Sequence, residues 1–284
     1  MKQRILSTCF LWGFIGIVLA KFGFVGGIFL LISLATLTIW EMYELMERIH
    51  LLPYKRIATF ITAIALAKYY LQNESICNID YILSTIAIST ILFALITVLQ
   101  KNPKALLISF LPTIFGITYI LIAFALPIAL TKILTLYYGS PNIAIALILW
   151  IIVVAKFSDV GGLVIGCKWG KHKLIPELSP KKSFEGLLGS FIFSAISGII
   201  FAKVCDQVFL CWPDNFTFWK MIIISCILSF FALVSDLIES GFKRLANVKD
   251  SGKIIPGIGG IFDLSDSLIL TLPLGVILIK NFIL

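Results

Sequence analysis

Charged residues are scarce in this chain of 284 residues: Asp, Glu, Lys and Arg make up 13% of it, against about 25% in soluble globular proteins. Hydrophobic residues make up 60%, and the mean hydropathy is +1.04. These proportions exclude a soluble enzyme, a disordered chain and a small disulfide-rich protein. The composition predicts an all-α fold, that of a polytopic integral membrane protein.

Paired cysteines are also lacking. The six cysteines form no CxxC pair and do not have the spacing of zinc ligands. Cys77, Cys205 and Cys211 fall in segments that we expect outside the membrane, where a disulfide and free thiols are equal alternatives. No internal repeat, low-complexity tract or separate soluble domain is evident.

Apolar runs long enough to span a bilayer, about 20 residues each, follow one another along the chain. The first run follows Met1–Arg4 as in a signal peptide, but Leu19-Ala20-Lys21 is a poor cleavage site and another apolar run follows at once. We therefore expect about nine transmembrane helices, or eight without the first. Their approximate ranges are 5–20, 22–40, 57–72, 81–99, 105–130, 143–165, 185–204, 219–238 and 267–283.

The 23 Lys and Arg exceed the 15 Asp and Glu by eight, and the charges lie in short segments between the apolar runs. There they face anionic headgroups, set the topology or bind phosphates, which argues against a nucleic-acid partner. With the N-terminus placed in the cytoplasm, 16 basic residues lie inside and six outside, as the positive-inside rule requires. This places the long loops 159–184 and 239–266 in the cytoplasm.

Three aspartates lie where predicted spans meet the second of these loops. Asp236 is 17 residues into the span that begins near Trp219, about 26 Å along a helix and thus near the inner boundary of the hydrocarbon. Asp263 and Asp266 follow at i, i+3 spacing and open the last span. Carboxylates are costly at this depth, so a functional role is expected, with an ion pair between Asp236 and Lys243 as the alternative. The three offer oxygen ligands for a divalent cation such as Mg²⁺.

The loop before the last span combines lysines with glycines. Glycines beside a proline let the backbone pass close to a bulky anionic ligand, and lysines neutralise its phosphates. In the first loop, Asp159 lies near the inner face with Lys156 one turn earlier, so an Asp–Lys pair is the alternative to a functional role. That loop ends in Ser-Pro-Lys-Lys-Ser, just before a helix N-terminus that also favours phosphate.

Two segments carry a recognisable pattern. Residues 240–266 read S-x2-K-R-x4-K-D-x-G-x2-I-P-x2-G-G-x2-D-x2-D, and residues 170–186 read G-K-H-K-L-x-P-x2-S-P-K-K-S-x-E-G. Both resemble the signatures of the phosphatidate cytidylyltransferases, also called CDP-diacylglycerol synthases. The resemblance covers about 40% of the chain, at its C-terminal end. The chain departs from the family pattern at Ile258 (histidine in the family), Leu264 (arginine), Ser265 and Cys167, but every carboxylate of the pattern is present.

The resemblance implies transfer of the cytidylyl group of CTP to phosphatidate, giving CDP-diacylglycerol and pyrophosphate in phospholipid biosynthesis. By analogy with the family, Asp236 and Asp263 would bind Mg²⁺, supported by Asp266. The implied catalytic residues are Asp236, Asp263, Asp266, Lys249 and Asp250. The implied substrate-binding residues are Lys243, Arg244, Lys253, Ser240, Gly259, Gly260, Lys181, Lys182, Ser183 and Asp159.

The resemblance also implies separate roles for the N- and C-terminal helices and a location in the cell. Helices within 1–140 would form a scaffold, and 141–284 would form the catalytic region, in a bacterial-type inner membrane with the active site cytoplasmic. A homodimer is compatible with the sequence. Two other functions remain open: a CTP-dependent lipid kinase, which would transfer the γ-phosphate, and a transporter, against which the clustering of polar residues on one membrane face argues.

Overall fold

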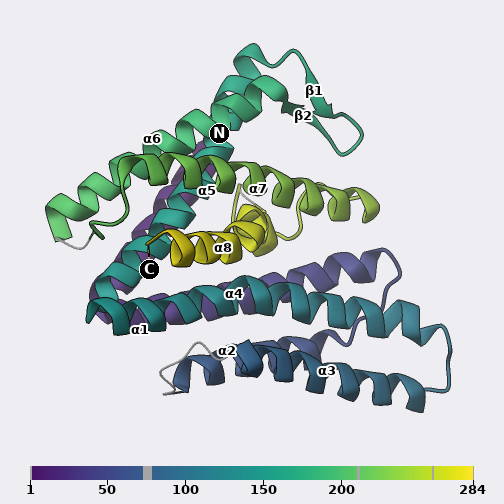
Figure 1. Cartoon of the computed structure of the whole chain (residues 1–284). Coiled ribbons are helices and arrows are strands. Elements are labelled where there is room, and N and C mark those ends of the chain that lie inside the picture. The colour runs from purple at the N-terminus through teal and green to yellow at the C-terminus, as the bar shows by residue number, and fades with distance from the viewer. Residues whose placement is uncertain (1, 73–78, 210–211, 258, 284) are drawn as a thin grey trace. The chain divides into compact units, whose positions relative to one another are not determined.

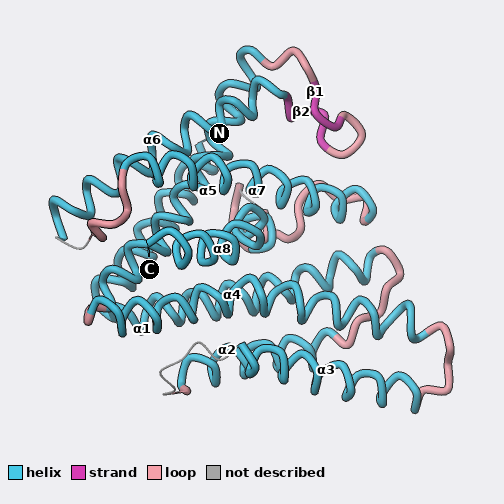
Figure 2. The backbone as a smooth tube through the Cα atoms, in the orientation of Figure 1, coloured by secondary structure: helices cyan, strands magenta, loops and turns pink. Residues whose placement is uncertain are grey.

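The computed structural model describes residues 2–72, 79–209, 212–257 and 259–283, and they are almost entirely helical (Figures 1 and 2). The all-α prediction is confirmed, with one short antiparallel hairpin added between the fifth and sixth helices. The elements, in chain order, are α1 (Lys2–Arg48), α2 (Lys55–Leu71), α3 (Ile79–Leu99), the π-helical turn η1 (Leu106–Phe110), α4 (Leu111–Tyr138), α5 (Pro141–Trp169), β1 (Lys173–Ile175), β2 (Ser179–Ser183), α6 (Phe184–Phe209), α7 (Phe218–Leu245) and α8 (Ile261–Ile283).

Seven helical segments within the described part of the chain are long and apolar enough to cross a membrane. The chain is therefore a multi-pass membrane protein, but the predicted count of nine spans is not confirmed. The first two predicted spans fall within α1, where Gly23 breaks the helical geometry with φ 52° and ψ −132°. Only glycine adopts such angles readily, so a kink joins the two halves where a loop was expected. The third predicted span is α2, which is only 17 residues long.

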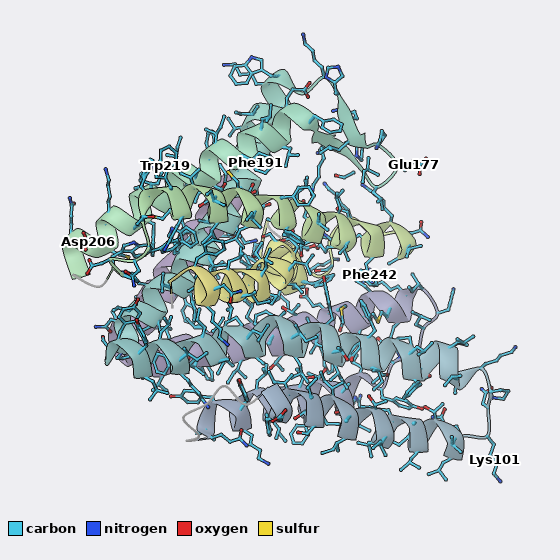
Figure 3. All side chains as sticks on the ribbon, in the orientation of Figure 1. Lys101, Glu177, Phe191, Asp206, Trp219 and Phe242 are labelled. Atoms are coloured by element: carbon cyan, nitrogen blue, oxygen red, sulfur yellow. The ribbon has the colours of Figure 1, made fainter. Side chains whose placement is uncertain are left out.

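Charged side chains in the connections lie at the surface. Lys101, between α3 and η1, and Glu177, in the turn of the hairpin, are both exposed (Figure 3). Along α3, apolar side chains such as Ile88 (66% exposed) and Val98 (73% exposed) face outward, as expected for a helix in contact with lipid. The choice between a disulfide and free thiols stays open, since Cys77 and Cys211 lie outside the described residues; Cys205 is buried.

The described chain forms two compact units. Unit 1 contains residues 1–129 and 242–265, and unit 2 contains 130–241 and 266–284. The glycine-rich loop thus belongs to the same compact unit as the N-terminal helices. The predicted division of roles between 1–140 and 141–284 stays a prediction.

Within unit 2, α5 and α6 pack closely because glycines face one another. A methyl group added to Gly161 would collide with the carbonyl oxygen of Gly189, and one added to Gly189 would collide with that of Gly161. Small residues of this kind let helix backbones approach each other in membranes. Hydrogen bonds across the unit add to the packing: the Trp150 indole donates to the carbonyl of Gly198 at 3.0 Å, and the hydroxyls of Ser158 and Ser229 are 2.7 Å apart.

Candidate active site

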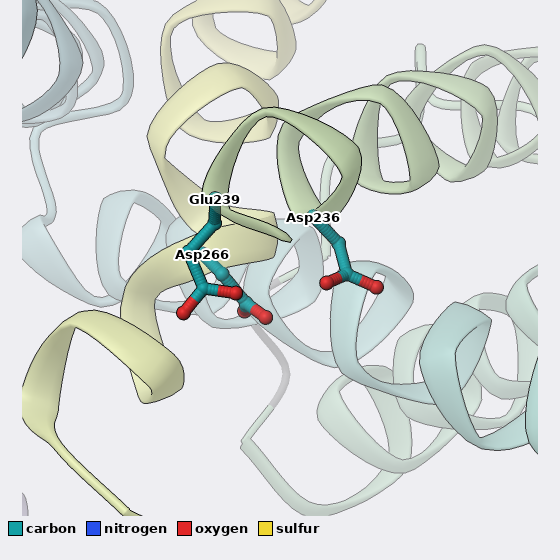
Figure 4. A group of neighbouring side chains, drawn as sticks. All are labelled: Asp236, Glu239 and Asp266. Carbon is teal, nitrogen blue, oxygen red and sulfur yellow. The ribbon is translucent and has the colours of Figure 1, made fainter. Parts of the chain in front are cut away.

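Three carboxylates meet within unit 2. Asp236 and Glu239 stand one turn apart near the C-terminal end of α7, and Asp266 lies near the start of α8 (Figure 4). One ligand atom from each lies within 4.8 Å of the others. Glu239 is almost fully buried, at 2% exposure. We call these three residues the acidic cluster.

Local contacts set the position of this cluster. The hydroxyl of Ser235, next to Asp236, donates to the backbone carbonyl of Asp266 and so ties α7 to the first turns of α8. Asp236 and Glu239 share one face of α7 because they are three residues apart. The hydrogen bond from Ser235 thus holds the start of α8 beside the face of α7 that carries Asp236 and Glu239.

Two lysines and a fourth carboxylate surround the cluster. Lys182, from β2, forms an ion pair with Asp236. Lys156, on α5, lies 3.3 Å from Asp266 and 3.8 Å from Asp159, and also donates to the hydroxyl of Ser267 at 2.8 Å. The sequence alternative of a Lys156–Asp159 pair is confirmed. The cluster and Asp159 thus place four carboxylates close to the ammonium groups of Lys156 and Lys182.

This donor set fits a hard divalent cation. Mg²⁺ binds oxygen ligands at about 2.1 Å, so oxygens on opposite sides of the ion are about 4.2 Å apart. A separation of at most 4.8 Å needs only a small inward movement of the side chains to reach that geometry. The three residues offer carboxylate oxygens and no sulfur or imidazole ligand, which also favours Mg²⁺ over zinc. Asp236, Glu239 and Asp266 would hold the ion.

Asp263 has different surroundings, in unit 1. Its carboxylate lies 2.5 Å from the ammonium of Lys243 and accepts hydrogen bonds from the backbone N–H groups of Ser251 (3.0 Å) and Gly260 (2.7 Å). The sequence alternative of an Asp236–Lys243 pair is therefore wrong: Lys243 pairs with Asp263, and Lys182 pairs with Asp236. The assignment of Asp236 and Asp263 as one pair of metal ligands stays a prediction.

The loop between α7 and α8 holds most of the other predicted residues. Lys249, Asp250 and Lys253 are exposed, as is Arg244 at the end of α7, whereas Ser240 and Gly259 are half-buried and Gly260 is buried. Gly259 has φ +122°, a backbone conformation open mainly to glycine, and a side chain there would also collide with Asp263. Ile258, which replaces the family histidine, lies outside the described residues.

The hairpin places its predicted residues in three different ways. Lys181 is exposed, Lys182 reaches the acidic cluster, and Ser183 is buried, at 2% exposure. The hydroxyl of Ser183 accepts from the backbone N–H of Gly186 at 3.1 Å, which is the geometry of a helix N-cap at the start of α6. Ser183 therefore stabilises the helix terminus that follows Lys182.

Sequence reasoning did not include Glu239 among the ligands or Glu41 among the site residues. The signal for Glu239 was present, because it stands three residues after Asp236 and shares its helix face. Glu41 offered no local signal: it lies near the C-terminal end of α1, where Glu44 and Glu47 follow, and its partners Ser251 and Phe262 are more than 200 residues away.

An apolar cavity in unit 2 is separate from these groups. It has a volume of about 490 Å³ and is lined by side chains of α5 and α6, among them Phe157, Phe193 and Phe201. Ser197 is its one polar lining residue, so this cavity does not offer the charges that a nucleotide requires.

Comparison with known proteins gives a consistent result. The family described as the cytidylyltransferase family matches residues 2–282. A protein of Staphylococcus haemolyticus named phosphatidate cytidylyltransferase is 37% identical over 194 residues, or 67% of this chain and 66% of that protein. A protein of the same name from Staphylococcus saprophyticus is 35% identical over 88% of this chain and 89% of its own length. The protein of this name from Staphylococcus aureus is 31% identical over 90% and 92%.

Proposed function

The chain belongs to the cytidylyltransferase family, and on this premise we propose that it transfers the cytidylyl group of CTP to phosphatidate. An oxygen of the lipid phosphate forms a bond to the α-phosphorus of CTP while the bond from that phosphorus to the bridging oxygen of the β-phosphate breaks. The products are CDP-diacylglycerol and pyrophosphate. The names of the relatives support this pair of substrates. The structural observation that supports the reaction is the acidic cluster beside two lysines, which suits a metal-assisted transfer between phosphates.

The reaction needs no nucleophile from the protein, because the lipid phosphate attacks. What the chain must supply is in-line positioning and neutralisation of charge. Asp236, Glu239 and Asp266 would hold Mg²⁺, which when bound neutralises phosphate oxygens and lowers the cost of bringing two anions together. Lys182 and Lys156 orient two of these carboxylates through the contacts described above.

The exposed basic residues around the α7–α8 loop are suited to hold phosphates. Lys249, Lys253 and Arg244 are exposed on that loop or at its start, and Lys181 is exposed on the hairpin. We assign to them the triphosphate of CTP and the phosphate of the lipid. Gly259 and Gly260 have no side chain that would keep a phosphate away from the backbone. Ser240, Asp250 and Asp159 stay predicted substrate contacts. Lys243 can bind substrate only if its ion pair with Asp263 breaks.

The location follows from the chemistry of the two substrates. A water-soluble nucleotide must meet a lipid headgroup, so the site belongs at the boundary of the membrane. We propose that this is the cytoplasmic face of a bacterial inner membrane, because the loops 159–184 and 239–266 carry nine of the basic residues and the relatives are bacterial. The homodimer stays a prediction, and the mass of the protein in detergent would test it.

The test uses purified protein in mixed micelles of detergent and phosphatidate, with Mg²⁺ and CTP labelled at the α-phosphate. We expect label in the lipid phase and release of pyrophosphate, both abolished by EDTA and restored by added Mg²⁺. Release of CDP with unlabelled lipid would replace the proposal with a lipid kinase. Accumulation of an unmodified substrate in sealed vesicles would replace it with a transporter.

A further inference from the structure

Glu41 is a buried carboxylate in the last two turns of α1, exposed by only 2%. Its Oε2 accepts a hydrogen bond from the hydroxyl of Ser251 at 2.8 Å and another from the backbone N–H of Phe262 at 2.9 Å. Ser251 lies in the α7–α8 loop, and Phe262 is the second residue of α8. A single carboxylate of an N-terminal helix therefore binds both the loop and the helix start that follows it.

The carboxylate of Glu41 packs directly against two glycines, where a larger residue would not fit. A methyl group added to Gly252 or to Gly260 would collide with its oxygens. Among the described residues Glu41 forms no ion pair, and its Oε1 has no hydrogen-bond partner. Burying a carboxylate without a cation is expensive. Its two donors both come from the segment that carries the family signature.

Ser251 links Glu41 to Asp263. Its hydroxyl donates to Glu41, while its backbone N–H donates to the carboxylate of Asp263 at 3.0 Å. Gly260, which packs against Glu41, also donates its N–H to Asp263 at 2.7 Å. The carboxylate of Asp263 is thus held by two backbone groups whose own positions depend on Glu41. Glu41 does not contact Asp263 in this arrangement and acts through the loop.

We propose that Glu41 is a positioning residue, which holds the segment from Lys249 to Phe262 so that Asp263 and the loop lysines face the substrates. The kinetic part of this inference rests on the proposed function, and the structural part does not. A residue of α1, far from the signature in sequence, would then take a direct part in shaping the α7–α8 loop.

The experiment compares Glu41→Ala and Glu41→Gln in micelles, using hydrogen–deuterium exchange without metal or substrate and then steady-state kinetics. The amide oxygen of Gln can accept both hydrogen bonds that Oε2 accepts, whereas Ala can accept neither. For Glu41→Ala we expect faster exchange confined to about residues 250–263 and a kcat about 10–100-fold lower, the range seen when supporting residues are removed. Glu41→Gln is expected to show the wild-type exchange pattern and a kcat within about threefold of wild type, since the hydrogen bonds remain.

Glu47→Ala is the matched control, because Glu47 lies on the same helix with a side chain that is 42% exposed and paired with Lys55. It should change neither the exchange of the loop nor kcat. Wild-type exchange and kcat in Glu41→Ala would overturn the proposal. Equal losses in the Gln and Ala variants would also overturn it, because they would show that the charge matters and the hydrogen bonds do not.

If Glu41→Ala does not fold, Ser251→Ala decides. It removes the hydroxyl that joins loop and helix but keeps the backbone N–H that serves Asp263. We expect faster exchange of the loop and a several-fold lower kcat, and unchanged values would overturn the proposal. A wild-type protein that labels no lipid would refute the proposed function, while the exchange data would still decide whether Glu41 holds the loop.

Discussion

Two carboxylates on the first turns of α8, three residues apart, have opposite surroundings. Asp263 contacts the ammonium of Lys243 and accepts hydrogen bonds from the backbone N–H groups of Ser251 and Gly260, which compensate its charge. Asp266 lies beside two further carboxylates, those of Asp236 and Glu239, and also 3.3 Å from the ammonium of Lys156. Both residues are aspartates on the same helix, one turn apart. We therefore expect a cation at Asp266 and not at Asp263, because only Asp266 has further carboxylates beside it.

Asp266→Asn should have the largest effect. It removes a ligand from the acidic cluster, and we expect activity to fall by at least about 100-fold, because even residues that only support a metal ligand are worth about 10–100-fold. The melting temperature in detergent should no longer rise when Mg²⁺ is added, since the bound ion stabilises the folded state only where it binds. Asp206→Asn, an exposed carboxylate on α6, is the control and should behave as wild type. Full activity of Asp266→Asn would refute the cation site.

Asp263→Asn should have the next largest effect. The amide oxygen can still accept from Ser251 and Gly260, but the ion pair with Lys243 is lost, and we expect a loss of activity of about 10–100-fold. The rise of the melting temperature with Mg²⁺ should be retained. If that rise disappears as it does in Asp266→Asn, Asp263 is a metal ligand after all, as the family resemblance implies.

Lys156→Met should have a smaller effect, and in the opposite direction: it should strengthen the binding of Mg²⁺. The ammonium group lies 3.3 Å from Asp266 and competes with a cation for it, so its removal should lower the half-saturating Mg²⁺ concentration. We expect a decrease of up to about tenfold, equivalent to about 1.4 kcal/mol. Lys203→Met, on the exposed part of α6, should leave the Mg²⁺ titration unchanged. A higher Mg²⁺ requirement in Lys156→Met would mean that the lysine organises the ligands and does not compete with the ion.

Lys253→Met should have the smallest effect. This lysine is exposed in the α7–α8 loop, and an exposed ion pair contributes about 1 kcal/mol or less. The KM for CTP should rise by about two- to fivefold, with kcat and the melting temperature unchanged. Lys104→Met, exposed in the connection between α3 and η1, controls for the loss of one positive charge. An unchanged KM for CTP would remove Lys253 from the substrate contacts.

Much of the fold could be predicted because it depends on local properties. Apolar runs and the residues that interrupt them place most of the helices, and the fourth to ninth predicted spans agree with α3 to α8. The count of nine is not confirmed at α1, where Lys21 separates the predicted spans 5–20 and 22–40 and the structure has one kinked helix. A helix can continue through a glycine with unusual angles, and periodicity alone does not distinguish a kink from a turn.

The site was harder to predict than the helices that carry it. Asp236, Asp266, Lys182 and Lys243 were all identified, but their pairing was not, since helical spacing fixes the face on which a residue lies and says nothing of the helix opposite. Ser183 was expected to contact substrate, and its hydroxyl caps α6. Glu239 joined the cluster only when α7 and α8 were placed side by side.

The sequence by itself determined that the chain spans a membrane, which family it resembles and which residue types carry the chemistry, because each of these depends on composition and short-range order. Only the tertiary structure decided which carboxylates meet, which lysine neutralises each of them, and that Glu41 binds the α7–α8 loop from helix α1. Electrostatic partners lie a few ångströms apart in space but up to 221 residues apart in sequence. Coulomb energy depends on the distance in space and not on the separation in sequence.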